Sequence, residues 1–464
     1  MKTYRRTTFA LICSILMLTP VHGVERPNLI IIMTDDHGYA DVGFNGSEDI
    51  PTPNIDRIAT EGVKFTHGYV TYPVCGPSRA GMITGRYQGR FGFRNNPTLN
   101  PFDPMAGIPV EEENIAEILG KVGYHSGVIG KWHLGTHPRF RPNVQGFDEF
   151  YGFVAGGHNY FPEDLIYPTI EDVDQKGGWY RTKILRNEEI VETNEYLTDE
   201  LSNEAVDFVI RNQSKPFFLY LAYNAPHSPL QASEKYLQRF THIADPKRRT
   251  YAAMVSAVDD GVGRILAELD RQGLSDNTLV FFLSDNGGPE SNGSSNTPLR
   301  GFKGALYEGG MHVPFAVRWP GRIPAGKTYE NPVSSMDILG TMVGLTGVSI
   351  AADRPLDGVN LLPYLNGEKI GNPHDVLFWQ MFAKEEQAVR QGTDKLISFG
   401  RTGVTELYDL RSDLAETRDS AGRDSVKAVA LKEKLDQWTA ELKPPLFKGL
   451  GSWDPAKSNK PVAP

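Results

Sequence analysis

The sequence predicts an α/β protein, with a mostly parallel central sheet sandwiched by helices and a smaller C-terminal subdomain of antiparallel sheet plus helix. Three observations predict this architecture. Strand-like and helix-like segments alternate from about residue 27 to about residue 350, as they do in a parallel sheet with helical connections. The strand-like segments are continuous apolar runs, which is typical of strands buried on both faces. Past about residue 375 the alternation ends.

The alternating segments follow from their composition. The apolar run that opens the mature chain is rich in isoleucine and predicts a buried strand. The first helical segment has proline near its start and glycine at its end, which are signals of helix boundaries. In the longest helical segment, Met254, Val258 and Val262 lie along one stripe. The expected strands cover residues 28–33, 126–129, 216–223, 279–283 and 313–317, and the expected helices cover residues 53–62, 114–123, 201–212 and 251–273.

The end of the chain is expected to form the smaller subdomain. Short β-rich segments at 396–397 and 406–410 precede a helical segment at 425–442. The pattern changes within residues 350–375, and we place the boundary there. The main domain then covers residues 24–370 and the C-terminal subdomain covers residues 371–464.

The overall composition is that of a folded globular protein. Of the 464 residues, 40% are hydrophobic and 23% are charged. The formal net charge of −9 argues against nucleic acid as a partner, because nucleic-acid binders are usually basic. The charge does not exclude an anionic substrate, since a few basic residues or a metal ion can reverse the sign inside one pocket.

The segment 1–23 is typical of a cleaved signal peptide. Lys2, Arg5 and Arg6 give it a positive start, an apolar run covers residues 9–18, and the segment ends in a small residue. A membrane anchor is the alternative, but the apolar run is too short to span a bilayer. We therefore expect an exported protein, periplasmic or secreted, with no stable membrane insertion.

Only two cysteines occur, and the first, Cys13, lies inside the expected signal peptide. The mature chain would keep Cys75 alone and would have no internal disulfide. An unpaired thiol in an exported protein indicates intermolecular pairing, a reactive role or chance.

Two oxygen-rich pairs follow predicted strands. Asp35 and Asp36 come after the first strand, and Asp285 and Asn286 come after the strand at 279–283. Ligands of open parallel sheets bind beyond the carboxyl ends of the strands, so the two pairs can converge on one cation. Carboxylate and amide oxygens favour Ca²⁺ or Mg²⁺ over zinc. For either pair alone, a turn or a helix cap is the alternative interpretation.

The single cysteine begins the string Cys-Gly-Pro-Ser-Arg79, followed by Ala-Gly-Met-Ile-Thr-Gly-Arg86. Ser78 or a neighbour can open a helix, which would put Cys75 just before a helix N-terminus. Such a position favours a negatively charged ligand.

This string resembles the signature of type I sulfatases, a family of the alkaline-phosphatase-like superfamily. Similar segments occur in order along nearly all of the mature chain: Asp35-Asp36, Gly130-Lys-Trp-His-Leu-Gly135, Asn224-Ala-Pro-His227, Ser284-Asp-Asn-Gly-Gly288, Gly301-Phe-Lys-Gly304 and Glu308-Gly-Gly310. The resemblance implies a sulfuric ester hydrolase with the alkaline-phosphatase-like fold, similar to bacterial polysaccharide sulfatases.

The resemblance also implies the roles of the site residues. A maturation enzyme would convert Cys75 to formylglycine, whose hydrated aldehyde supplies the attacking hydroxyl. Arg79 would hold that hydroxyl. Such a site must neutralise sulfate, activate a weak nucleophile and protonate the leaving alcohol. Lys131 and Lys303 would bind sulfate oxygens, His227 would act as the general acid, His133 would act as the base, and one Ca²⁺ would be held by Asp35, Asp36, Cys75, Asp285 and Asn286.

The expected substrate is a sulfated carbohydrate. An aromatic segment at 147–161 could stack on sugar rings, and His158 within it could bond a sugar hydroxyl. A packed aromatic core is the alternative for its phenylalanines. Similarity to bacterial polysaccharide sulfatases favours an algal galactan such as carrageenan.

Other functions stay open at this point. Glycosaminoglycan or aryl sulfates are alternative substrates. A phosphonate or phosphodiester hydrolase of the same superfamily is an alternative enzyme, and a glycan-binding relative without catalysis is a non-enzymatic one.

Overall fold

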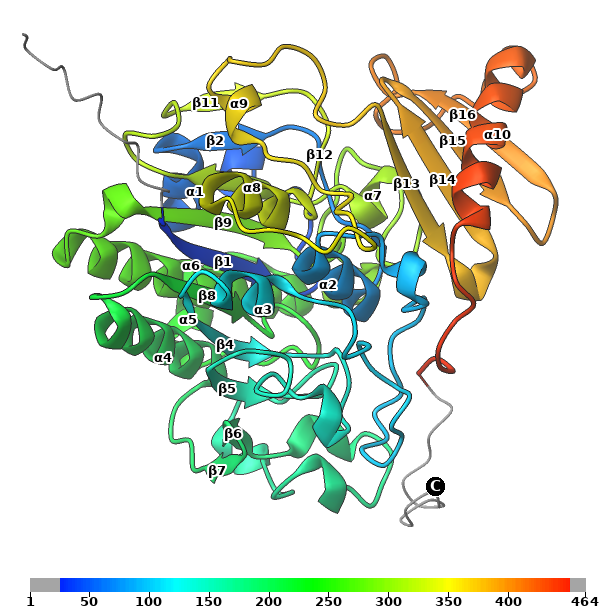
Figure 1. Cartoon of the computed structure of the whole chain (residues 1–464). Helices are drawn as coiled ribbons and strands as arrows, with labels where there is room; N and C mark the ends of the chain where they lie inside the picture. The colour runs from blue at the N-terminus through cyan, green and yellow to red at the C-terminus, as the bar shows by residue number, and fades with distance from the viewer. Residues whose placement is uncertain (1–25, 451–464) are drawn as a thin grey trace, which may run out of the picture.

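The structure is a computed structural model that describes residues 26–450, so the expected signal peptide lies outside the described residues. Its centre is a ten-stranded sheet in the order β11-β2-β10-β9-β1-β8-β4-β5-β6-β7 (Figure 1). The five parallel strands in the middle are β9 (Thr278–Ser284), β1 (Asn28–Thr34), β8 (Phe217–Ala222), β4 (His125–Lys131) and β5 (Glu149–Phe153). The predicted mostly parallel sheet is confirmed.

The strands at both edges depart from the parallel pattern. The expected strand at 313–317 is β10 (Phe315–Arg318), and it runs antiparallel to β9. A short apolar run does not reveal strand direction, which the path of the preceding loop decides. The other edge strands are β2 (Val63–Phe65), β11 (Lys327–Tyr329), β6 (Ile184–Arg186) and β7 (Glu189–Val191), and β3 (Gly68–Tyr69) pairs separately with β12 (Val333–Ser334).

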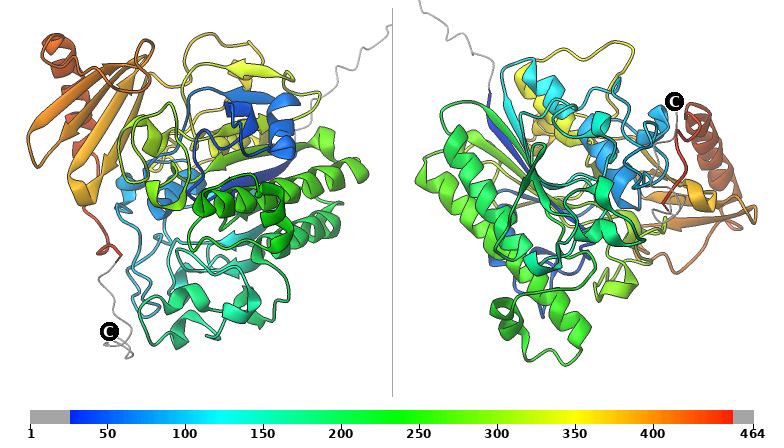
Figure 2. Two further views of the ribbon diagram at one scale, coloured as in Figure 1. Left: turned by 180° about the vertical axis from the view of Figure 1, so that it is seen from behind. Right: turned by 90° about the horizontal axis from the view of Figure 1, so that it is seen from below.

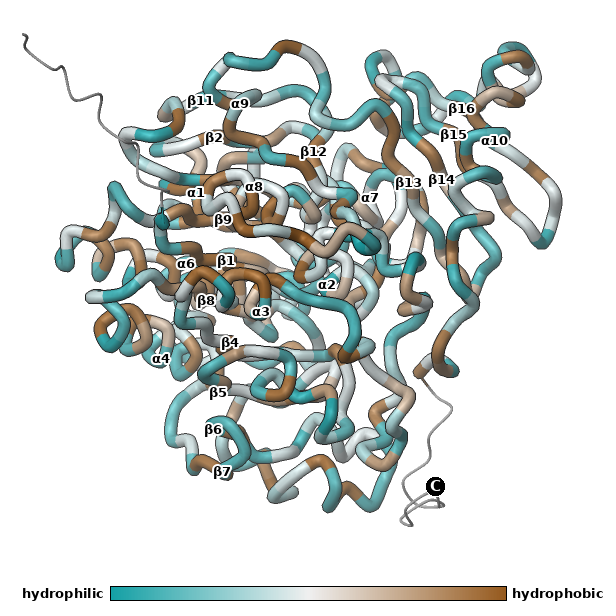
Figure 3. Tube along the Cα trace, viewed as in Figure 1, coloured by the Kyte–Doolittle hydropathy of each residue, from teal (hydrophilic) through white to brown (hydrophobic). Residues whose placement is uncertain are grey.

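Helices cover both faces of the sheet (Figures 1 and 2). One layer contains α1 (Pro53–Thr60), α4 (Leu197–Asn212), α5 (Glu234–Leu237) and α6 (Pro246–Arg271). The opposite layer contains α2 (Cys75–Thr84), α3 (Ile115–Gly120) and α8 (Asp337–Thr346). The strands between the layers are fully buried and apolar, as the brown tube along β1, β8 and β9 shows (Figure 3). Among residues 26–450, no helix has the length and apolar character needed to cross a membrane.

The C-terminal subdomain is a four-stranded antiparallel sheet with one helix. Its strands are β13 (Val376–Met381), β14 (Glu386–Gln391), β15 (Asp394–Phe399) and β16 (Val404–Asp409), paired in sequence order. Helix α10 (Ser425–Ala440) packs on this sheet through Leu431, Leu435 and Trp438. The predicted strands near 396 and 406 and the predicted helix are confirmed, whereas β13 and β14 were not predicted. The remaining helices are α7 (Glu308–Met311) and α9 (Leu362–Leu365).

A buried ion cluster joins this subdomain to the main domain. Lys395 of β15 is fully buried, and its ammonium lies 2.8 Å from Glu308 of α7 and 2.8 Å from Glu416. The Glu308 amide donates to the Glu416 carboxylate at 2.7 Å, and the other Glu308 oxygen lies 3.0 Å from His312. Burial raises the pKa of Glu416 to about 7. Lys395 is thus the cation that holds two buried carboxylates together.

We predict that Lys395→Met destabilises the protein strongly. Without the ammonium, Glu308 and Glu416 keep buried negative charge with less compensation, which costs about 3–5 kcal/mol. Lys427→Met is the matched control, because the Lys427–Asp394 pair is largely solvent-exposed and contributes about 0–1 kcal/mol. Urea denaturation followed by tryptophan fluorescence measures the free energy of unfolding of both variants. An equal decrease in this free energy for the two variants would contradict the prediction.

Candidate active site

Two oxygen-rich pairs meet at the carboxyl end of the central sheet. β1 and β9 pair in parallel with Thr34 opposite Ser284, so Asp35 and Asp285 emerge side by side. The Asp285 amide donates to the Thr34 carbonyl at 3.0 Å, and the Asp36 amide donates to Oδ1 of Asp285 at 3.3 Å. The structure therefore brings together the two pairs that follow these strands in the sequence.

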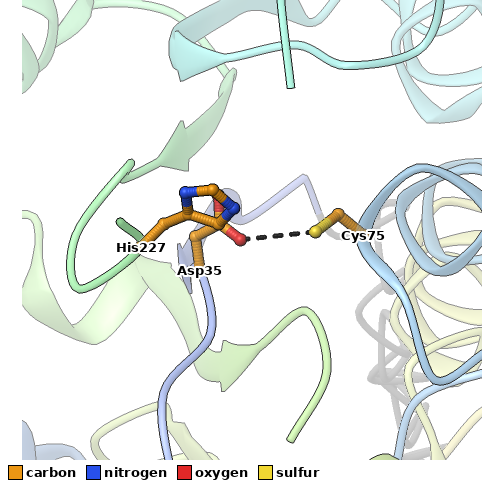
Figure 4. A group of neighbouring side chains, drawn as sticks. All are labelled: Asp35, Cys75 and His227. Atoms are coloured by element: carbon orange, nitrogen blue, oxygen red, sulfur yellow. Dashed lines mark hydrogen bonds between the residues drawn. The ribbon is translucent and has the colours of Figure 1, made fainter. Parts of the chain in front are cut away.

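Cys75 lies against this group. It is the first residue of α2, one position inside the helix start rather than before it. Its Sγ lies 3.5 Å from Oδ1 of Asp35, and the ring of His227 lies beside them (Figure 4). Ligand atoms of Asp35, Asp36, Cys75 and Asp285 all lie within 4.8 Å of one another, and all four residues are buried.

The oxygen atoms of this group suit a hard divalent cation. Asn286 uses its amide nitrogen to donate to Asp36 at 2.7 Å, which leaves its Oδ1 buried without a hydrogen-bond partner among the described residues. Burial and the neighbouring charge of Asp35 raise the pKa of Asp285. An unpaired amide oxygen beside crowded carboxylates is a set of oxygen donors that suits a divalent cation such as Ca²⁺ or Mg²⁺.

Three cations compensate the carboxylates. Lys131, at the end of β4, forms a fully buried ion pair with Asp35. Arg79 of α2 donates to Asp285 through Nε at 2.9 Å, its Nη2 lies 2.8 Å from the same carboxylate as an ion pair, and Nη1 donates to the Tyr220 hydroxyl at 3.2 Å. These contacts fix the positions of the buried charges below the reaction site.

Lys303 is the third cation and reaches the sulfur. Its ammonium lies 2.6 Å from Oδ1 of Asp36 and 3.2 Å from Sγ of Cys75. Burial opposes ionisation of Asp36, but the charges of Lys303 and His227 outweigh it and hold the pKa of Asp36 at about 2.

Two histidines face the sulfur from other elements. His133 follows β4 in left-handed backbone (φ 56°), a conformation that costs about 1–3 kcal/mol and persists only where surrounding contacts fix it. Its ring is buried, and neither ring nitrogen has a hydrogen-bond partner within residues 26–450. His227 keeps Nε2 at 3.6 Å from Asp36, while its Nδ1 lies 2.5 Å from the Ser228 carbonyl oxygen. Burial lowers the pKa of His227 to about 3.

A cavity of about 310 Å³ opens above these groups. Cys75, His133, His227 and Lys303 form its inner wall. Lys131 and Arg79 do not line it, because both are fully buried beneath the carboxylates. The cavity is the path by which a substrate reaches position 75.

The position of His158 corrects one expectation from the sequence. The ring is fully buried, with Nδ1 2.7 Å from the Asn159 carbonyl oxygen and Nε2 2.7 Å from the Thr182 carbonyl oxygen. No ring nitrogen is left to bond a sugar hydroxyl. The phenylalanines of the same segment belong to the core, which was the alternative interpretation: Phe147, Phe150 and Phe153 are 1–3% exposed.

Several cavity residues were missed by the sequence analysis. They belong to irregular segments that come together only in the fold, and they are Asn96, Leu99, Lys176, Trp179, Tyr180 and Leu450. The one local signal was the glycine pair at 177–178 before Trp179 and Tyr180, since paired glycines mark a turn or loop.

The sheet topology, with a cation site at the carboxyl ends of its central strands, is that of the alkaline-phosphatase-like superfamily of hydrolases. Within that class, a family model described as Sulfatase matches residues 27–348, more than half of the chain. The chain therefore belongs to the sulfatase family and is a sulfuric ester hydrolase. A second model, described as N-sulphoglucosamine sulphohydrolase, C-terminal, matches residues 302–441.

Relatives along most of the chain agree with this assignment. N-acetylgalactosamine-6-sulfatase of Mus musculus is 38% identical over 379 residues, which cover 78% of this chain and 71% of that protein. The uncharacterized sulfatase YdeN of Escherichia coli (strain K12) is 34% identical and covers 76% and 68%. Among solved structures, the chain in the crystal structure of Ps i-CgsB in complex with k-i-k-neocarrahexaose is 38% identical in sequence to this one. The two superpose with a TM-score of 0.85, and the match covers 91% of this chain and 94% of that one. The family implies formylglycine and a divalent metal ion, and the donor set described above fits such an ion.

We predict that divalent cations stabilise the fold, because their removal leaves Asp35, Asp36 and Asp285 to repel one another. At a Ca²⁺ concentration 100 times Kd, the gain is about 2.7 kcal/mol. Asn286→Ala removes the unpaired amide oxygen and is expected to weaken the Ca²⁺-dependent rise in Tm. Scanning calorimetry after chelation and readdition of Ca²⁺ measures this rise.

The matched control for this experiment is Asn366→Ala, whose side chain is exposed. The Tm of this variant should rise with Ca²⁺ as much as that of the parent protein. An Asn286→Ala protein with the same dependence as the parent would show that the amide oxygen binds no cation.

Proposed function

We propose that the protein removes sulfate from sulfated polysaccharides or their oligosaccharides, with an algal galactan such as carrageenan as the substrate. The observation that carries the proposal is the cavity in which Cys75, His133, His227 and Lys303 face one space beside aromatic side chains. The likeness to Ps i-CgsB, whose complex contains a neocarrahexaose, supports a galactan. The likeness to N-acetylgalactosamine-6-sulfatase makes a glycosaminoglycan the second candidate.

The proposed chemistry begins at position 75. A formylglycine at this position would supply the attacking hydroxyl, and Asp35, Asp36, Asp285 and Asn286 would hold a Ca²⁺ ion that supplies positive charge for the sulfate oxygens. Lys303 stands closest to the sulfur and binds a sulfate oxygen directly. Lys131 acts from beneath through its ion pair with Asp35.

The two histidines divide the proton transfers. His227 lines the cavity with Nε2 toward the carboxylates, and it protonates the departing sugar oxygen. Burial keeps it neutral in the free site, and a bound sulfate anion favours its protonated form. The ring nitrogens of His133 have no hydrogen-bond partner among the described residues, and one of them would accept the proton of the second hydroxyl. The carbonyl would then form again as the bond from the same carbon to the sulfate oxygen breaks and sulfate leaves.

We also propose that the chain is exported after cleavage near residue 23 and that a formylglycine-generating enzyme matures it. The basic start and short apolar run of residues 1–23 support export. The single cysteine within a Cys-x-Pro-x-Arg string supports maturation at that residue.

The experiment that tests the proposed function is sulfate release from a panel of substrates, measured by ion chromatography. We expect release from carrageenan oligosaccharides by protein whose Cys75 peptide shows sulfur replaced by oxygen and two fewer hydrogens. Cys75→Ser lacks the second hydroxyl that expels sulfate, so its turnover is expected to fall about 10³-fold or more.

Each other result identifies a different function. Sulfate release from glycosaminoglycan oligosaccharides alone would identify the second candidate, a glycosaminoglycan, as the substrate. Faster turnover of aryl phosphodiesters than of aryl sulfates would identify a phosphodiesterase. Activity of protein with an unmodified Cys75 thiol would exclude formylglycine from the mechanism.

We predict that the substitution His227→Ala slows the hydrolysis of sugar sulfates more than that of aryl sulfates. A sugar alkoxide is a poor leaving group and needs the proton, so kcat/KM is expected to fall about 10²–10⁴-fold. A nitrophenolate leaves without a proton, so kcat/KM for nitrophenyl sulfate should fall far less. His242→Ala, which changes an exposed histidine, is the control. Equal losses on both substrates would show that His227 does not protonate the leaving group.

A further inference from the structure

The outer wall of the cavity has no part in the reaction proposed above. It consists of Asn96, Leu99, Lys176, Trp179, Tyr180 and Leu450, and it lines the same cavity as Cys75 and Lys303. A sugar whose sulfate reaches Cys75 must lie in this cavity. The outer wall therefore contacts the parts of the substrate that do not react.

The aromatic part of this wall is held rigidly. Tyr180 lies in a short 3₁₀ turn (Gly178–Arg181), and its carbonyl accepts the Asn159 amide at 2.8 Å. Its ring stacks toward His227, with centroids 6.4 Å apart and an interplanar angle of 27°. A Cβ on Gly157 would come within 2.5 Å of the Tyr180 ring, so only glycine permits this packing. The buried His158 ring, through its contact with the Thr182 carbonyl, joins the same two segments.

Lys176 differs from the other cations around the cavity. Lys131, Lys303 and Arg79 each pair with a carboxylate of the metal-binding group. Lys176 is exposed and lines the cavity, and within residues 26–450 it makes no hydrogen bond or ion pair. An uncompensated ammonium at the edge of a substrate cavity attracts an anionic group of the ligand.

We propose that Lys176, together with Trp179 and Tyr180, forms a subsite for a second anionic group of the substrate, next to the sulfate that is cleaved. The aromatic rings cover the sugar, and the ammonium contacts a second oxyanion on the same or the adjoining sugar. This inference rests on the proposed function, because it assumes a carbohydrate in the cavity. The oxyanion is a second sulfate ester or a uronate carboxylate, which share the charge that Lys176 recognises.

The test measures competitive inhibition of 4-nitrophenyl sulfate hydrolysis by matched oligosaccharides. The first carries one sulfate, the second carries two sulfates, and the third carries one sulfate and one carboxylate. Lys176→Met is expected to raise Ki about 5-fold for the doubly charged compounds at low salt and to leave Ki of the singly charged one unchanged. Hydrolysis of the aryl sulfate itself should stay unchanged, and added salt should reduce the difference.

Two further variants complete the design. Lys176→Arg keeps the charge and should keep the parent Ki. Lys215→Met removes an exposed lysine just before the amino end of β8, whereas the site lies at the carboxyl ends of the strands, and it should change no Ki. The compound that responds to Lys176→Met, two sulfates or sulfate plus carboxylate, identifies the oxyanion.

The outcomes separate this inference from the proposed function. Equal Ki changes for singly and doubly charged compounds, or none for any, would overturn the subsite at Lys176. Inhibition does not require cleavage of the oligosaccharide, so failure of the proposed function shows separately, as absence of sulfate release from the same compounds.

Discussion

The site depends on the neutralisation of three buried carboxylates that stand beside one another. Asp35, Asp36 and Asp285 are almost completely excluded from solvent, and an isolated charge in such a place costs several kcal/mol. Lys131, Lys303 and Arg79 each pair with one of them. Of these three cations only Lys303 also lines the cavity, so it alone both compensates a buried carboxylate and faces the space that an anion can enter.

The sequence predicted the central strands because buried parallel strands have a distinctive apolar composition. It also predicted the meeting of the two acidic pairs, since residues that follow neighbouring parallel strands emerge at one edge. The reverse direction of β10 was not predictable, because a short apolar run reads alike in both directions. Strand β14 is mostly polar and lacked the apolar signal, whereas β13 has an apolar run, Val-Leu-Phe-Trp, that the sequence analysis did not use.

The site residues that were wrongly assigned or missed were so for a different reason. His158 was assigned to the substrate from a glycine-rich string, but two carbonyl oxygens occupy its ring nitrogens in the fold. Lys176, Trp179 and Tyr180 lie on an irregular segment whose path no periodicity reveals. They line the same cavity as Cys75, and Tyr180 is held there by long-range packing against Gly157 and His227. Loop residues were therefore predictable where they directly follow a strand or belong to a family motif, as Asp35 and Lys303 do, and Lys176, Trp179 and Tyr180 have neither signal.

The ion cluster around Lys395 bears on how such a chain can evolve. Glu308 stands only a few residues after Lys303, and its countercharge comes from the far end of the sequence. The two matched family regions overlap at this point rather than abutting. A recombination event that exchanged the last quarter of the gene would have to supply a lysine and a glutamate at equivalent places.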